Sequence, residues 1–166
     1  MTEDPIPRPV IGVGVLVWRN RQILLGERVS AKQADCWQLP GGHLESNESV
    51  VECARREVLE ETGIQVKGLR HLGYTDDPFE IAGKKYITLL VSCEYDSGEA
   101  EVLEPDKCAR WQWFDYLSLP SPLFVPISNY LAQITAVSEP VTGKADLYAL
   151  HRASRVLTVA PSGGRR

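Results

Sequence analysis

Three glutamates near the middle of the chain, Glu57, Glu60 and Glu61, have a spacing that allows them to act together. If their segment is a helix, the three carboxylates fall within an arc of about 100° on one side of it. Like charges three and four residues apart destabilise a helix, so a cation is expected beside them. Carboxylate oxygens without a nearby His or Cys favour Mg²⁺ or Mn²⁺ over zinc. The pattern therefore indicates a divalent-metal site, against the alternative of a solvated acidic helix face.

The neighbouring Arg56 can offset only part of this negative charge. It points to another side of the same helix, where it could pair with Glu60 or with Glu48 of the preceding loop. One guanidinium balances one charge of the cluster and leaves the others. A hard divalent cation is the natural remaining partner.

The helix that must carry these residues is expected at 49–61. This segment contains neither Gly nor Pro, and Val51, Ala54 and Val58 have the spacing of one buried face. Gly63 is expected just past its end, because glycine readily adopts the left-handed conformation of a helix C-cap.

Strands are expected on both sides of this helix. Apolar and alternating patterns predict them at 10–18, 22–27, 37–39, 65–74, 86–95 and 111–114, and helical spacing returns at 127–134. The turn Arg19-Asn20-Arg21 joins the first two strands, and Pro40-Gly41-Gly42 ends the third. This order predicts an α+β domain over 10–137 with helices flanking a mixed sheet. A flexible arm at 1–9 and a partly disordered extension at 138–166 complete the expected organisation.

Composition narrows the possible function classes. The chain has 166 residues, 43% hydrophobic and 24% charged, as is typical of one globular domain. Its longest apolar run, 10–18, is far shorter than the about 20 residues of a membrane helix, and residues 1–5 lack the features of a secretion signal. No basic stripe suggests a nucleic-acid polymer as partner. We therefore expect a cytoplasmic protein without a membrane partner.

The four cysteines are far apart in the sequence and never form a CxxC pair, so neither a zinc site nor a disulfide framework is indicated. We expect reduced, mostly buried thiols. They are Cys36, Cys53, Cys93 and Cys108.

The segment from Gly42 to Ile64 carries the pattern G-x5-E-x7-R-E-V-x-E-E-x-G-I. This pattern resembles the signature of the Nudix (MutT-like) hydrolases at every fixed position. The resemblance extends over about residues 10–137 and implies the Nudix fold, a mixed sheet sandwiched between helices (α/β/α). It also implies hydrolysis of a nucleoside diphosphate linked to a further group, by metal-assisted attack of water on phosphorus.

The resemblance implies roles for individual residues. Glu57 and Glu61 would be the main metal ligands, helped by the Gly41 carbonyl and by Glu60. The cofactor would be Mg²⁺, with Mn²⁺ as a possible substitute. Bound Mg²⁺ withdraws charge from phosphate oxygens and holds them in line, which is the physical requirement for attack on a polyphosphate.

Arg56 and Glu48 would form, by the same resemblance, the pair that orients the helix. The general base for the attacking water would be a glutamate inside the motif or in a later loop. Three candidates stay open for this role: Glu57, Glu60 and Glu104.

Further segments resemble one branch of the family, the nucleoside triphosphate diphosphatases that include sanitising enzymes for oxidised guanine nucleotides. The chain departs from that branch at Val125-Pro126, where the branch has a second aromatic residue and a glycine. The residues that the resemblance places around the nucleotide are Arg28, Leu39, His43, Thr88 and Phe124.

Three functions are consistent with these observations. The first is hydrolysis of nucleoside triphosphates, such as 8-oxo-dGTP, to a monophosphate and pyrophosphate. The second is hydrolysis of ADP-ribose or a nucleotide sugar, since some relatives of that kind carry a proline about 15 residues past the motif and Pro78 follows Ile64 at a similar distance. The third, a non-catalytic ligand sensor, is disfavoured because all motif glutamates are present. The expected partner is a small nucleotide, and the resemblance suggests a homodimer.

The charge distribution agrees with metal-bound polyphosphate. The formal net charge is -4. Residues 42–64 hold six acidic and two basic side chains, so the whole excess lies in this segment. Bound divalent ions would reverse its sign at the point where a phosphate binds.

Overall fold

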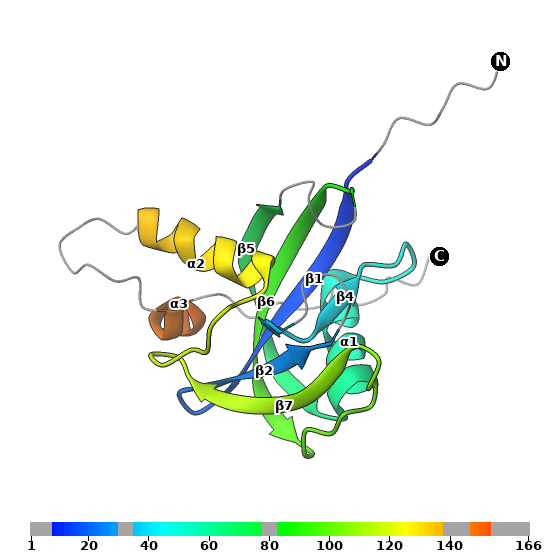
Figure 1. Cartoon of the computed structure of the whole chain (residues 1–166), viewed down its shortest axis with the longest axis vertical. Helices are drawn as coiled ribbons and strands as arrows, with labels where there is room; N and C mark the ends of the chain where they lie inside the picture. Colours follow the sequence, from blue (N-terminus) through cyan, green and yellow to red (C-terminus); the bar gives the residue numbers. More distant parts are fainter. Residues whose placement is uncertain (1–7, 30–34, 78–82, 138–146, 154–166) are drawn as a thin grey trace, which may run out of the picture.

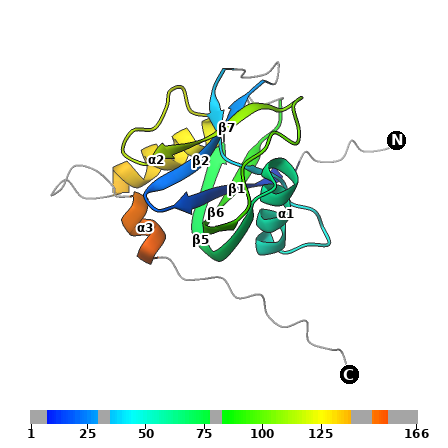
Figure 2. The same cartoon turned by 90° about the horizontal axis from the view of Figure 1, so that it is seen from below.

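The computed structural model describes residues 8–29, 35–77, 83–137 and 147–153. A mixed β-sheet lies between helices on both faces (Figure 1). Helix α1 (Val50–Thr62) covers one face, and helices α2 (Val125–Val137) and α3 (Leu147–Ala153) lie on the other, as the turned view in Figure 2 also shows. The predicted α+β class and the α/β/α arrangement are confirmed. Among the described helices, none combines the length and the apolar character needed to cross a membrane.

The sheet is held together along a long central strand, β1, which runs parallel to β6; the other pairs are antiparallel. Strand order is β3-β2-β1-β6-β5, with β4 also joined to β1 and β7 to β2. The strands are β1 (Val10–Arg19), β2 (Gln22–Arg28), β3 (Trp37–Gln38), β4 (Gly41–His43), β5 (Gln65–Asp77), β6 (Tyr86–Ser97) and β7 (Cys108–Asp115).

Strand β1 changes partner along one of its edges. At the hairpin it pairs with β2, Trp18 opposite Ile23, around a turn at Asn20 that has a positive φ of 58°. Farther toward its beginning, Gly12 and Gly14 pair instead with β4. Strand β2 no longer pairs with β1 at this level, and its Gly26 and Glu27 pair with β3, while β7 pairs with β2 along most of its length. Strands β2 and β4 therefore pair with β1 one after the other along its length, β2 at the hairpin and β4 nearer the start of the strand.

The two faces of β1 belong to two apolar clusters. Val13, Val15 and Val17 pack with the buried face of α1, whereas Leu16 and Trp18 pack with residues of α2 and α3. This alternation follows from the two-residue period of a strand. Burial on both sides explains the continuous apolar run seen in the sequence.

Helix α1 is bounded by local signals at both ends. Ser49 caps its start by accepting a hydrogen bond from the Glu52 backbone at 3.1 Å, while Glu52 accepts one from the Ser49 backbone at 2.7 Å. Such a capping box satisfies two otherwise unpaired amides. Gly63 ends the helix with φ of 77° and donates to the Leu59 carbonyl. The predicted helix and its glycine cap are confirmed.

The structure differs from the sequence-based expectation in three places. Strands β5, β6 and β7 are longer than predicted, because cross-strand pairing carries polar residues that the apolar pattern missed. The glycines after Pro40, expected only to end a strand, form β4 against β1. Helix α3 was not predicted, and its Leu147 is buried in the apolar cluster between the sheet and α2. Parts of the expected arm and extension, 1–7, 138–146 and 154–166, lie outside the described residues, as does Pro78.

All four cysteines are buried thiols, as predicted. Burial raises the pKa of Cys108 to about 11 and is the largest cause that raises the pKa of Cys53 to about 12. These thiols therefore stay protonated near neutral pH.

Candidate active site

Helix α1 presents two of its glutamates to the turn that leads into β4. Glu61 is almost fully buried, at 8% exposure, and its Oε2 lies 3.4 Å from the Gly41 amide, which donates to it. A Cβ atom placed on Gly42 would lie only 2.3 Å from Glu57 Oε1. The missing side chain of Gly42 therefore makes the space that the Glu57 carboxylate fills.

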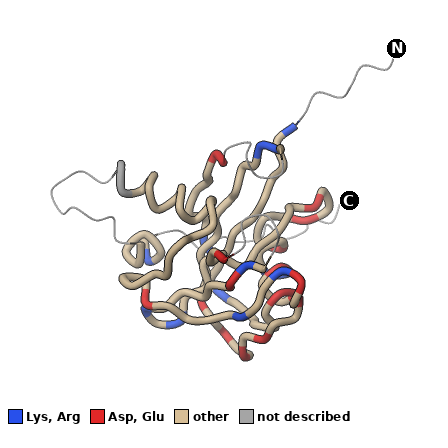
Figure 3. The backbone as a smooth tube through the Cα atoms, in the orientation of Figure 1, with Lys and Arg blue, Asp and Glu red and all other residues tan. Residues whose placement is uncertain are grey.

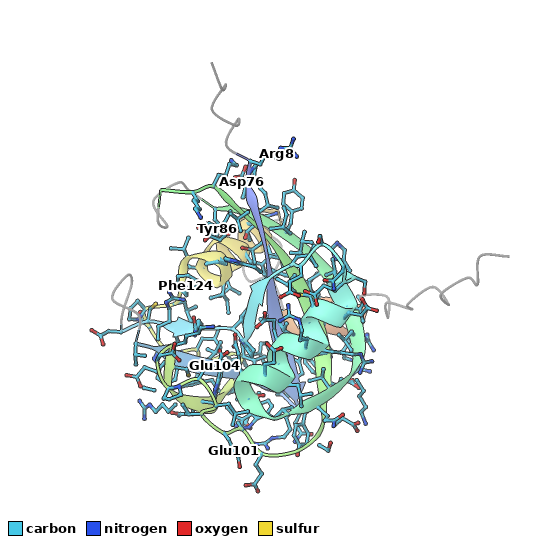
Figure 4. All side chains as sticks on the ribbon, turned by 90° about the vertical axis from the view of Figure 1, so that its right-hand side faces the viewer. Arg8, Asp76, Tyr86, Glu101, Glu104 and Phe124 are labelled. Atoms are coloured by element: carbon cyan, nitrogen blue, oxygen red, sulfur yellow. The ribbon has the colours of Figure 1, made fainter. Side chains whose placement is uncertain are left out.

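A third carboxylate reaches this position from the loop between β6 and β7. Glu104 lies beside α1 in Figure 4, close enough for its charge to act on Glu61. Its Oε2 is buried and accepts no hydrogen bond within the described part of the chain, although Lys107 Nζ lies 3.3 Å away. The sequence places this glutamate more than 40 residues after α1, so only the fold brings it to the helix.

The surroundings of Glu61 disfavour its ionised form. Its pKa is raised to about 8, first by burial and then by the charges of Glu57 and Glu104. Each of these causes disfavours the ionised carboxylate. A cation would reverse the preference, so this site has the electrostatic character of a cation-binding site.

The residues fit a hard divalent cation in chemistry. In the residues that the structure describes, no three acidic, His or Cys side chains already converge on one point. Glu57 and Glu61 nevertheless offer carboxyl oxygens, and a single arginine contacts Glu48, Glu57 and Glu60 together. Oxygen ligands of this kind suit Mg²⁺ or Mn²⁺ and not zinc. Glu60 lies farther out, with half of its side chain exposed and a 3.2 Å contact to Arg56.

Arg56 holds the start of the motif to the helix. Its guanidinium makes two hydrogen bonds to Glu48, Nε to Oε2 at 2.8 Å and Nη2 to Oε1 at 2.7 Å. It also donates to Glu57 Oε1 at 2.9 Å. Bonding to Arg56 lowers the pKa of Glu48 to about 2, and bonding to Glu48 raises the pKa of Arg56. The pairing that the sequence suggested between Arg56 and Glu48 or Glu60 is thus present with both.

A cavity of about 240 Å³ opens beside this cluster, at the place where β2 no longer pairs with β1 and β4 pairs with it instead. It is bounded by β1, β2, β4, β6 and the start of α2. Gly41 and Gly42 line it on one side and contact the motif glutamates on the other. All five residues expected around the nucleotide line this cavity: Arg28, Leu39, His43, Thr88 and Phe124.

Two of these residues contact each other and together form part of the cavity wall. The guanidinium carbon of Arg28 lies 4.1 Å from the centre of the Phe124 ring. Arg28 also donates from Nη1 to Gln38 Oε1 at 2.7 Å, and burial lowers the pKa of this guanidinium. The cavity therefore has one flat wall made of a cation stacked on an aromatic ring.

Sequence reasoning missed several residues of the cavity and its floor. Gly12 and Gly14 line it from β1, and Tyr86 lines it from β6. Beneath Thr88 lies Asp77, a fully buried carboxylate at the end of β5. The one available signal was a pair of glycines two residues apart in a buried strand, which removes two side chains from the same face.

Acidic residues are concentrated around α1 and its neighbouring loops, as Figure 3 shows. The segment 42–64, which carries the excess of four negative charges in the sequence, contains α1 and lies within this concentration. This concentration lies on the side of the cavity that Gly41 and Gly42 form.

The NUDIX domain family model matches residues 8–133. A curated relative from Danio rerio, named oxidized purine nucleoside triphosphate hydrolase, is 34% identical over 106 residues, which are 64% of this chain and 66% of that protein. The NAD-capped RNA hydrolase NudC of Pseudomonas aeruginosa is 34% identical over 142 residues, 81% of this chain and 49% of that protein. The chain thus spans about two thirds of the first relative and about half of the second.

Solved structures agree with this match. A MutT NUDIX hydrolase from Burkholderia pseudomallei has a TM-score of 0.68 and 33% identity, covering 75% of this chain and 95% of that one. A bifunctional NMN adenylyltransferase/ADP ribose pyrophosphatase from Francisella tularensis, complexed with AMP and a Mn ion, has a TM-score of 0.57 and 27% identity. It covers 71% of this chain and 36% of that one.

Proposed function

This chain belongs to the NUDIX domain family of hydrolases, and from that premise we propose that it hydrolyses nucleoside triphosphates to a nucleoside monophosphate and pyrophosphate with Mg²⁺ bound. One observation carries the proposal. The same two glycines, Gly41 and Gly42, line the cavity and contact Glu61 and Glu57. A substrate whose base occupies the cavity would therefore place its phosphates toward the carboxylates.

The cavity volume supports the nucleobase end of a nucleotide as the occupant. Whole-ligand sites usually measure about 300–1,000 Å³, and this cavity is smaller, at about 240 Å³. It suits a base and leaves the polyphosphate outside, near α1. The relative from Danio rerio, named for oxidized purine nucleoside triphosphates, supports the same substrate class.

We assign roles to the residues of this chain as follows. Glu57 and Glu61 would hold the metal, with Glu60 and the Gly41 carbonyl as further ligands. When bound, Mg²⁺ would supply positive charge to the phosphate oxygens. The charges of Glu57 and Glu104, which together with burial raise the pKa of Glu61, would then be balanced.

Two groups of residues would prepare the site for attack by water. Arg56, held by Glu48, fixes the Glu57 carboxylate through a hydrogen bond to its Oε1. Glu104 is our candidate for the general base, because its Oε2 is buried and its one ion pair is with the largely exposed Lys107, whereas Glu57 and Glu60 both pair with Arg56. A base must be able to accept a proton from the attacking water.

The proposal is tested by a substrate panel with Mg²⁺: normal and oxidised dNTPs, ADP-ribose, nucleotide sugars and an NAD-capped RNA. Chromatography separates pyrophosphate release from the formation of two monophosphates. Glu61→Gln should lower turnover at least about 100-fold, because a ligand to the charge-stabilising metal is lost. Glu52→Gln is the matched control on α1, because glutamine preserves a capping box.

The panel also decides between the other candidates. Activity confined to ADP-ribose would replace our substrate by the one named for the Francisella tularensis structure. Activity confined to the capped RNA would point to the reaction named for NudC. Equal turnover by wild type and Glu61→Gln would contradict the metal assignment.

We also propose a homodimer, on family resemblance alone. Light scattering coupled to size exclusion measures the mass directly. A mass near 18.5 kDa would show a monomer instead.

A further inference from the structure

The hydroxyl of Thr88 lies on the floor of the cavity, on strand β6 opposite Gly12 of β1. A Cβ atom on Gly12 would lie 3.6 Å from Thr88 Oγ1 and 3.9 Å from the carbonyl oxygen of Gly42. Because glycine has no such atom, this point of the floor stays open. Two oxygens therefore border the opening.

The Thr88 hydroxyl donates its hydrogen to a carboxyl group that lies beneath the cavity floor. Thr88 Oγ1 donates it to Asp77 Oδ2 at 2.6 Å. Asp77 is fully buried, and Asn129 of α2 donates from Nδ2 to its other oxygen at 3.2 Å. Each oxygen of the Asp77 carboxyl group thus accepts one hydrogen bond, and the Thr88 hydroxyl and the Asn129 amide are the two donors.

This arrangement decides what Thr88 can offer to a ligand. A hydroxyl has one hydrogen and two lone pairs. With the hydrogen directed at Asp77, only lone pairs are left for the cavity. Thr88 therefore acts toward a ligand as a hydrogen-bond acceptor, and a ligand atom that is itself an acceptor is not satisfied there.

We propose that Asp77 is a specificity-determining positioning residue, which holds Thr88 as an acceptor so that the cavity selects nucleobases presenting an N–H donor to β6. The donor can be an exocyclic amino group or a ring N–H. This inference builds on the proposed function by narrowing the class of base. Asp77 acts through Thr88, since it does not itself line the cavity.

Binding of nucleoside monophosphates by calorimetry measures this preference without requiring turnover. Two ligand pairs differ by one exocyclic amino group on the base: GMP and IMP, and AMP and purine riboside monophosphate. A third pair, 8-oxo-GMP and GMP, differs by a ring N–H at N7, together with a carbonyl group at C8. The wild type should bind the member with the additional donor roughly 3- to 10-fold more tightly in at least one pair, the value of one hydrogen bond.

Two variants at position 88 separate the hydroxyl from the shape of the side chain. Thr88→Val keeps the shape and removes the acceptor, so it should abolish the preference. Thr88→Ser keeps the hydroxyl and should retain it. A loss of overall affinity without a change in the ratio between paired ligands would mean only altered packing, and would overturn the proposal.

Asp77→Asn tests the positioning role. Its amide can turn an N–H toward Thr88, which releases the Thr88 hydrogen for the cavity, so the ratio should fall toward one. Asp76→Asn is the matched control, because Asp76 is the neighbouring carboxylate on β5 but is exposed and paired with Lys85 at 2.5 Å. Far-UV and near-UV circular dichroism confirm that each variant is folded.

The outcomes separate this inference from the proposed function. If no triphosphate is hydrolysed but the paired ligands behave as expected, the proposed function fails and the role of Asp77 stands. If triphosphates are hydrolysed while the wild type shows no preference in any pair, the inference fails alone. An unchanged preference in Thr88→Val or in folded Asp77→Asn also overturns it.

Discussion

The carboxylate of Glu57 occupies the position where a side chain on residue 42 would begin. A Cβ atom there would lie 2.3 Å from Glu57 Oε1 and 2.5 Å from its carboxyl carbon. Real contacts of this kind are essentially never so short, so residue 42 and the Glu57 carboxylate cannot both keep their places unless residue 42 is glycine.

Gly42→Ala should therefore damage catalysis more than folding. The flexible end of Glu57 can move aside, so we expect only a modest decrease in the free energy of unfolding. The carboxylate would leave its place, and misplacement by about 1 Å can cost about 100-fold in rate. Steady-state kinetics and urea unfolding of the same variant compare the two effects. An unchanged kcat would show that the position of Glu57 does not matter for the reaction.

Gly12→Ala should have the opposite kinetic signature. Its nearest contact would be an ordinary 3.6 Å to Thr88 Oγ1, so the backbone can accept the methyl group. The methyl group would fill part of the cavity floor, away from Glu57 and Glu61. We expect a higher KM with little change in kcat, because binding alone is weakened. A fall in kcat equal to that in kcat/KM would contradict this expectation.

Binding of Mg²⁺ at pH 7 should release a proton. Without metal, Glu61 has a pKa of about 8 and is mostly protonated at pH 7. A metal ligand must be deprotonated, so affinity for the metal should rise by up to about tenfold per pH unit below pH 8. Calorimetry in buffers of different ionisation enthalpy counts the protons. Glu60→Gln should keep the release, and Glu61→Gln should lose it.

Stability should fall as the pH decreases from about 6.5 to about 4, in part through His151 of helix α3. This imidazole is buried, stacks on Trp18 at 5.1 Å and contacts Ser92 through Nδ1. Burial first, and then the charge of Arg70, lower its pKa to about 4, while Glu94 opposes the shift and Arg152 adds to it. The unfolded chain binds the proton more readily in this interval, so acid favours unfolding.

Comparison with His151→Gln isolates this contribution from that of the carboxylates. Urea unfolding at pH 7.5, 6 and 5 gives the free energy at each pH. The wild type should lose more than the variant, by roughly 1 to 3 kcal/mol at the lowest pH. Parallel curves for the two proteins would exclude His151 as a source of the pH dependence.

The reactive helix could be predicted from its own residues. Its apolar spacing, its glycine cap and its clustered glutamates are all properties of one continuous segment. Local signals of this kind act over a few residues, because capping and side-chain spacing depend only on near neighbours. The pairing of Arg56 with Glu60 could be anticipated for the same reason, since the two lie four residues apart on the helix.

Strand ends and helix α3 were harder to predict for a different reason. Asp76 and Asp77 continue β5 although they are polar, because Ile87 and Tyr86 of β6 pair with them. Leu147 makes α3 part of the fold by packing into a cluster formed by β1, β2, β6 and α2. A short polar segment becomes structured only when distant residues cover it.

The sequence by itself determined which residues could perform the chemistry, a group of carboxylates on one helix with an arginine among them. Only the tertiary structure decided what they could act upon. Arg28, Thr88 and Phe124 meet in one cavity because β1 pairs with β6 and diverges from β2. The hydrogen bond from Thr88 to Asp77 also depends on a strand pairing. Such contacts depend on how separate elements pack together, and that packing is set by the whole chain.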